Sequence, residues 1–161
     1  MDSVRVVAWN VEGVGAPGSS EYEALRTMLI HMDADVVGLN EVSGSDEVAY
    51  LEELAEDLGY GVVFGADADA AFGHLRNAVM SRFSLVEATA LGAAALSGDP
   101  EANDLTRPLI RAEFETPQGV RFTTLTGHWK SGTGNDDEFR RAVASTRACL
   151  LYTSPSPRDR G

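Results

Sequence analysis

Two apolar runs of strand length, each leading to an oxygen-bearing side chain, constrain the fold of this chain more than any other feature. The first covers residues 4–9 and leads to Asn10, and the second covers residues 35–39 and leads to Glu41. Apolar side chains at helical spacing over residues 20–32 predict one helix between them. A helical connection favours parallel strands, whose carboxyl ends meet at one edge of the sheet. We therefore expect Asn10 and Glu41 to lie close together.

Carboxylate and amide oxygens at such an edge suit a hard divalent cation. Magnesium prefers six oxygen ligands and keeps several waters, so a protein often supplies only one or two groups. Glu41 as a direct ligand, with Asn10 close by, fits this pattern and makes a divalent-metal site the first hypothesis. The alternative on spacing alone is that both residues only cap the loops that follow their strands.

The rest of the chain alternates further helices and strands. Hydrophobic periodicity predicts additional helices over residues 46–58 and 137–151, and strands over residues 60–64, 77–81, 85–90, 106–116 and 120–126. The last two strands are joined by Pro117-Gln118-Gly119, which predicts a β-hairpin. At 161 residues, this pattern indicates a single α/β (α+β) domain with a substantial core.

Charge and targeting signals narrow the function classes. The net charge is −12, from 13 basic and 25 acidic residues. Negative charge repels nucleic acid at long range, so a nucleic-acid substrate would need a local positive patch or a bound metal. The alternative is that the acidic residues only form a solvated surface. We expect no membrane span, because no apolar run is long enough. No signal peptide is visible, which favours the cytoplasm, and a single cysteine excludes an internal disulfide.

Candidate phosphate-binding residues lie at the open end of the predicted hairpin. His128 follows its second strand, and Lys130, the one lysine of the chain, lies two residues further on. Histidine can donate to a phosphate oxygen or act in acid/base chemistry, and lysine supplies a positive charge. Arg107 begins the other hairpin strand, so antiparallel pairing brings it close to His128. The alternative is a structural histidine at a strand end. Asn77, at the start of strand 77–81, is a further candidate, although asparagine there commonly forms a turn.

Five segments in order resemble motifs of the endonuclease/exonuclease/phosphatase superfamily, which has the deoxyribonuclease-I-like fold. They are VRVVAWNVEG, ADVVGLNEV, RNAVMSRFSL, TRPLIRAEF and TGHWKSG. The resemblance covers residues 4–150. It implies a four-layer α-β-β-α sandwich, in which two mixed β-sheets pack face to face with helices outside. It also implies a Mg²⁺-dependent phosphoesterase that hydrolyses a phosphodiester or phosphomonoester by attack of an activated water.

The resemblance also implies a role for each candidate residue. Glu41 would be the principal ligand of Mg²⁺, with Mn²⁺ or Ca²⁺ as alternatives, and Asn10 its neighbour in the metal and phosphate site. His128 would contact the scissile phosphate, and Asn77 begins a segment similar to the family's. Substrate binding is implied for Arg107, Lys130 and Ser131.

Two motifs of the superfamily are missing. They are an Asp-x-Asn motif that orients the attacking water and a terminal Ser-Asp-His-like motif. We therefore expect residues 1–151 to form the N-terminal part of the domain, with the second half incomplete. We expect this part to be inactive alone, because catalytic groups act as a unit.

Residues 152–161 are rich in Ser, Pro and Arg, which predicts a disordered, non-native tail. Two other hypotheses stay open: a non-catalytic binding or interaction protein that keeps the fold, and a chain too short to fold stably. The substrate could be nucleic acid or a small phosphoester, and no protein partner is identifiable.

Overall fold

The computed structural model describes residues 3–43, 45–65, 75–91, 108–129 and 132–153. Its elements, in chain order, are β1 (Val6–Asn10), α1 (Ser20–Met32), β2 (Val36–Ser43), α2 (Ser45–Asp57), β3 (Gly61–Phe64), β4 (Leu75–Ser81), β5 (Ser84–Leu91), β6 (Leu109–Glu115), β7 (Arg121–Thr126) and α3 (Asn135–Thr153). These match the order of helices and strands predicted from the sequence. None of the helices within the described ranges is long and apolar enough to cross a membrane.

Element boundaries differ from the prediction where local chemistry intervenes. β6 begins at Leu109 rather than at residue 106, directly after Pro108, whose nitrogen cannot donate to a ladder. β4 begins at Leu75, so Asn77 lies inside the strand and does not form a turn at its start. α3 continues through Thr153, two residues into the segment predicted as a tail, whereas residues 154–161 lie outside the described part of the chain.

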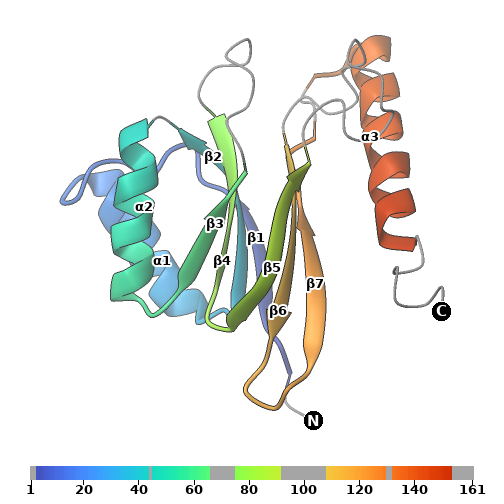
Figure 1. The fold of residues 1–161 in the computed structure, drawn as a ribbon. Coiled ribbons are helices and arrows are strands. Elements are labelled where there is room, and N and C mark those ends of the chain that lie inside the picture. The colour runs from blue at the N-terminus through green and yellow to red at the C-terminus, as the bar shows by residue number, and fades with distance from the viewer. Residues whose placement is uncertain (1–2, 44, 66–74, 92–107, 130–131, 154–161) are drawn as a thin grey trace.

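The strands form two sheets (Figure 1). The first has the order β1-β2-β4-β3, and the second has the order β5-β6-β7. β1 and β2 are parallel, as the helical connection between them predicted, and the other pairs are antiparallel. β6 and β7 form the predicted hairpin, in which Glu115 pairs with Arg121 across the turn.

Helices cover both outer faces of the sheet pair (Figure 1). α1 and α2 lie on the first sheet over an apolar cluster that includes Leu29, Leu51 and Met80. A second cluster, which includes Val79, Ile110 and Phe114, fills the space between the sheets. α3 lies on the outer face of the second sheet, where Ala144 joins Leu109. The predicted four-layer α-β-β-α sandwich is confirmed.

β1 is an edge strand with one uncovered face. Val7 and Trp9 pack toward the helical side of the sheet. Val4 and Val6 alternate with them and are 40% and 59% exposed. Because alternate strand side chains point to opposite faces, the second sheet leaves this part of the first sheet open to solvent.

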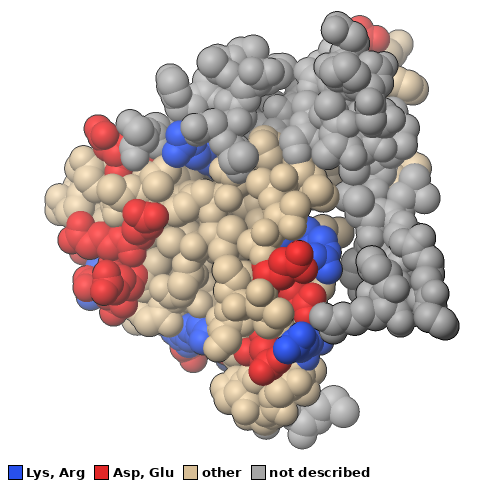
Figure 2. Space-filling view, viewed as in Figure 1, with Lys and Arg blue, Asp and Glu red and all other residues tan. Residues whose placement is uncertain are grey.

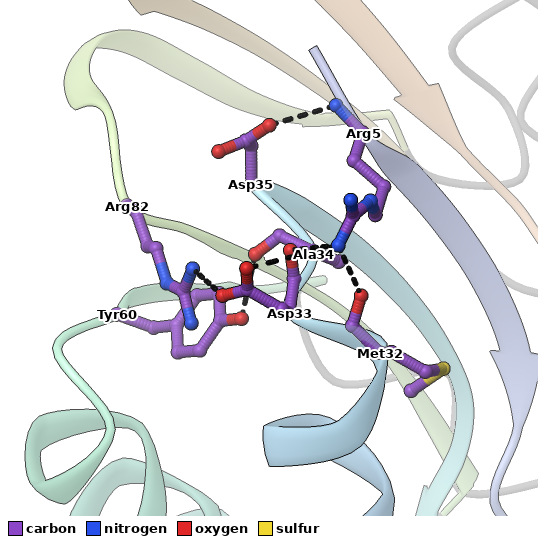
Figure 3. A network of polar contacts seen from close by, with 7 residues as sticks. All are labelled: Arg5, Met32, Asp33, Ala34, Asp35, Tyr60 and Arg82. Atoms are coloured by element: carbon purple, nitrogen blue, oxygen red, sulfur yellow. Dashed lines mark hydrogen bonds and ion pairs between the residues drawn. The ribbon is translucent and has the colours of Figure 1, made fainter.

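A polar network fixes the other end of the first sheet, where β2 begins and β4 ends (Figure 3). The Arg82 guanidinium lies 2.5 Å from Asp33 Oδ1 and 4.8 Å from the centre of the Tyr60 ring. The Tyr60 hydroxyl donates to the carbonyl of Ala34, and the Arg5 amide donates to Asp35. These contacts tie β1 and β4 to the turn between α1 and β2.

Three titratable groups of this network have shifted pKa values, and the hydrogen bond to Asp33 raises the pKa of Arg82. The hydrogen bond from Arg82 lowers the pKa of Asp33, and the charge of Arg82 acts in the same direction. Burial raises the pKa of Tyr60. The network therefore favours a charged Asp33 and a neutral Tyr60 near neutral pH.

Candidate active site

The layer between the sheets changes from apolar to polar toward the carboxyl ends of β1 and β2. Val36 and Val79 lie in the apolar part. Further along β2, a Cβ at Gly38 would come within 3.2 Å of the Thr126 side chain, so the sheets approach closely there. The next inward-facing positions beyond this constriction are polar.

A β-bulge in β2 places the carboxylate of Glu41. Leu39 pairs with Ala78 and Val42 with Arg76, so Asn40 and Glu41 together oppose the single residue Asn77. The backbone of Glu41 has a φ of +64°, in the left-handed region that L-residues rarely adopt. Bulges of this kind re-aim side chains and are common next to active sites.

Glu41 meets His128 from the second sheet. The distance from Glu41 Oε1 to His128 Nε2 is 3.6 Å, and the side chains are 22% and 15% exposed. His128 follows β7 after Gly127, where an added Cβ would lie 2.6 Å from Leu109 Cδ1. The backbone therefore passes close to the core just before the histidine. The two sheets bring together two residues that the sequence separates by 87 positions.

Asn10 lies at the same edge, as predicted. It pairs in parallel register with Asn40, directly before Glu41, and its side chain is exposed. The loop after β1 crosses the end of β2: the amide of Val11 donates to the Asn40 carbonyl and that of Gly13 to the Glu41 carbonyl. The edge is thus built from β1, β2 and the backbone that leaves β1.

The sequence reasoning missed Glu47 as a support for this loop. The Glu47 carboxylate, on the first turn of α2, accepts hydrogen bonds from the amides of Val14 at 2.9 Å and Gly15 at 3.4 Å. An acidic residue in the first turn of a helix is common, so its sequence context gave no signal for this long-range contact.

Asn77 is buried with a fixed amide orientation. It is 1% exposed, and its Nδ2 donates to the carbonyl of Pro108 at 2.9 Å, which links the two sheets. Reversing the amide would place oxygen against oxygen, so Oδ1 stays an acceptor. Within the described part of the chain, that Oδ1 is buried without a hydrogen-bond partner, as is the Oδ1 of Asn40.

The loop that begins at His128 is fastened at its far end by α3. Arg141 Nη1 donates to the carbonyl of Gly132 at 2.6 Å. Gly132 has a φ of +121°, in the region that favours glycine, and a Cβ there would also force the Asp137 carboxylate to move. Three predicted substrate-binding residues, Arg107, Lys130 and Ser131, lie outside the described residues.

The arrangement offers oxygen acceptors to a cation. Within the described residues, no three His, Cys, Asp or Glu side chains form a group suited to hold a metal. The Glu41 carboxylate as a ligand, and the orphaned amide oxygen of Asn40 beside it in sequence as an acceptor for a bound water, nevertheless fit a cation that keeps most of its waters, as Mg²⁺ does. The donor set therefore suits a hydrated hard ion rather than a fully protein-ligated one.

Comparison with known families shows which family has this site. The sequence profile of the Endonuclease/Exonuclease/phosphatase family matches residues 7–145. The chain belongs to this family. The family hydrolyses phosphoester bonds, which agrees with the predicted reaction class. No curated protein matches the chain in sequence.

Solved structures share the fold. A humanized TDP2 from D. rerio is 21% identical with a TM-score of 0.69, and the match covers 97% of this chain and 58% of that one. An endonuclease/exonuclease/phosphatase from Beutenbergia cavernae is 22% identical with a TM-score of 0.68, over 94% and 44% of the two chains. A mannosyl-6-phosphatase from Bacteroides thetaiotaomicron is 18% identical with a TM-score of 0.64, over 96% and 62%. This family member thus spans less than two thirds of the length of each of these three structures.

Proposed function

We propose that this chain is the N-terminal part of a divalent-metal-dependent phosphoesterase and that Glu41 is its principal metal ligand. The observation that carries the proposal is the 3.6 Å approach of Glu41 and His128 across the two sheets. A carboxylate that can bind a cation then lies beside an imidazole that can donate to a phosphate oxygen.

Each residue of the site has a proposed task. Glu41 and Asn10 hold the cation, with Mg²⁺ as the first choice and Mn²⁺ or Ca²⁺ as alternatives. The ion supplies stabilisation of charge on the phosphate and on the leaving oxygen. His128 donates to a phosphate oxygen, and Asn77 presents its fixed amide oxygen to the reacting groups. From motif position, Arg107, Lys130 and Ser131 bind the substrate.

The substrate is proposed as a phosphoester, either in nucleic acid or in a small molecule. Figure 2 shows acidic side chains gathered over the helical layer, where Glu52, Glu53, Glu56 and Asp57 of α2 are exposed. These residues contribute to the net charge of −12 on a face built by helices rather than by the strand ends. The overall charge is therefore compatible with an anionic substrate at the strand ends. One related TDP2 structure contains a single strand DNA product, and another relative is a mannosyl-6-phosphatase.

Metal binding tests the proposal directly. We expect the wild-type chain to bind Mn²⁺, measured by the loss of the free-ion electron paramagnetic resonance signal, and Glu41→Gln to abolish this binding. Glu23→Gln on the exposed face of α1 makes the same charge change and should bind as the wild type does. Equal Mn²⁺ affinity in wild type and Glu41→Gln would refute the assignment.

Hydrolysis tests the second part of the proposal. We expect no Mg²⁺-dependent hydrolysis of bis-p-nitrophenyl phosphate by this chain, because the Asp-x-Asn and Ser-Asp-His-like motifs are missing from its sequence. A longer gene product that carries both motifs should be active and should lose activity on Glu41→Ala. A longer native product without them, and without activity, would instead support the non-catalytic binding protein.

A further inference from the structure

The side-chain oxygen of Asn40 is an unusual feature of the first sheet. It is buried and has no hydrogen-bond donor among the residues that the structure describes. A buried acceptor without a donor destabilises a protein, so such groups in native structures call for a specific explanation. Asn40 lies one residue before Glu41 and in register with Asn10. The unsatisfied oxygen is therefore at the edge that carries the proposed metal ligands.

The bulge turns two consecutive side chains of β2 away from the helical layer. Leu39 and Val42 both pack in the cluster under α1 and α2, although they are three positions apart. In a regular strand, such residues would point to opposite faces. The extra residue at the bulge restores the helical side for Val42 and leaves Asn40 and Glu41 between the two apolar positions.

Two neighbours show where these side chains point. Gly38, two positions before Asn40 and on the same strand face, lies against Thr126 of the second sheet. Glu41 reaches His128, which follows the same strand β7. Both Asn40 and Glu41 therefore face the second sheet at the site, instead of alternating between faces as their sequence positions suggest.

We propose that Asn40 is a positioning residue of the metal site. Its Oδ1 accepts a hydrogen bond from a water in the hydration shell of the cation that Glu41 binds. This inference rests on the proposed function of Glu41. A water bound to the ion is then the hydrogen-bond donor for Asn40 Oδ1. This hydrogen bond also helps an edge with one carboxylate to hold an ion that retains its waters.

Asn40→Leu tests the proposal, because leucine is similar in size and removes only the polar end. We expect the variant to bind Mn²⁺ about tenfold to a hundredfold more weakly, the range found when groups that orient a metal's ligands are removed. In EDTA, its urea midpoint should equal or exceed that of the wild type, since a buried unsatisfied acceptor has been removed. A purely structural asparagine would lower the midpoint and leave Mn²⁺ affinity unchanged.

Two further variants complete the comparison. Asn40→Asp keeps an acceptor oxygen at this position and should bind Mn²⁺ at least as well as the wild type. This variant tests the proposal independently of whether Asn40→Leu folds. Thr124→Val removes another polar group from β7, one that donates to the Ala112 carbonyl, and should leave Mn²⁺ affinity unchanged. Weaker binding in Asn40→Asp would overturn the proposal.

The outcomes separate this inference from the proposed function. Mn²⁺ binding that depends on Glu41 but is unchanged in Asn40→Leu would overturn the role of Asn40 alone. Absence of Glu41-dependent binding in the wild-type chain would overturn both. Weaker binding in Asn40→Leu without a lower urea midpoint in EDTA would support both.

Discussion

Replacing Glu41 by glycine should stabilise the metal-free protein relative to replacing it by alanine. Both variants remove the carboxylate, so they differ only by the Cβ methyl group, which restricts the backbone of alanine. Glu41 has a φ of +64°, and the left-handed region costs an L-residue about 1–2 kcal/mol. Alanine keeps this strain and glycine removes it.

The expected size of the difference follows from two opposing terms. Relief of the left-handed strain contributes about 1–2 kcal/mol, whereas the greater freedom of glycine in the unfolded chain opposes it by about 0.4–1 kcal/mol. The free energy of unfolding of Glu41→Gly should therefore exceed that of Glu41→Ala by roughly 0.5–1 kcal/mol. Urea denaturation in EDTA measures this difference directly.

A matched pair at Glu113 provides the control. Glu113 lies in the middle of β6, and its φ is not in the positive region. There the order should reverse, with Glu113→Gly less stable than Glu113→Ala by about 0.5–1 kcal/mol, because glycine weakens a strand interior. If Glu41→Gly were also less stable than Glu41→Ala, strain at the bulge would be refuted as a property of this site.

Two further predictions concern the rest of the fold. The stability that Asp33 provides should be fully present above its unfolded pKa of about 3.9 and lost as pH falls through its lower folded pKa. Asp33→Asn, which keeps a residue tolerant of positive φ, should lack that part of the acid-induced loss in urea titrations between neutral and low pH; an unchanged pH profile would contradict this. Gly127→Ala should destabilise by about 1–3 kcal/mol through the clash with Leu109, whereas Gly61→Ala, whose added Cβ comes no closer than 3.8 Å to another atom, should be tolerated in the same thermal-unfolding assay.

Local chemistry in the sequence was sufficient for most of the elements. Helical spacing predicted α1 over residues 20–32, which are its bounds in the structure. The helix between β1 and β2 was enough to predict their parallel pairing. The turn at residues 117–119 was enough to predict the hairpin that leads to His128. Each of these predictions rests on residues that are near one another in the chain.

The candidate site was predictable only in part. Asn10 and Glu41 were expected at one edge because each follows a predicted parallel strand, and the register of Asn10 with Asn40 confirms that placement. The predicted end of the second strand at residue 39 was wrong, because β2 continues through Ser43 and Glu41 lies inside it at the bulge. The place of Asn77 inside β4, its link to Pro108 and the support from Glu47 had no local signal. Their partners lie about 30 residues away in sequence, and side-chain contacts at that range depend on how the layers dock.

By itself, the sequence determined the order of helices and strands, the parallel β1–β2 pair and the residue types available for a phosphoester site. Only the tertiary structure decided the bulge at Asn40 and Glu41, the facing of both side chains toward the second sheet and the approach of Glu41 to His128. The physical reason is that periodicity records which face of its own element a residue occupies. Register between β2 and β4, and the contact of one sheet with the other, arise from packing of distant segments.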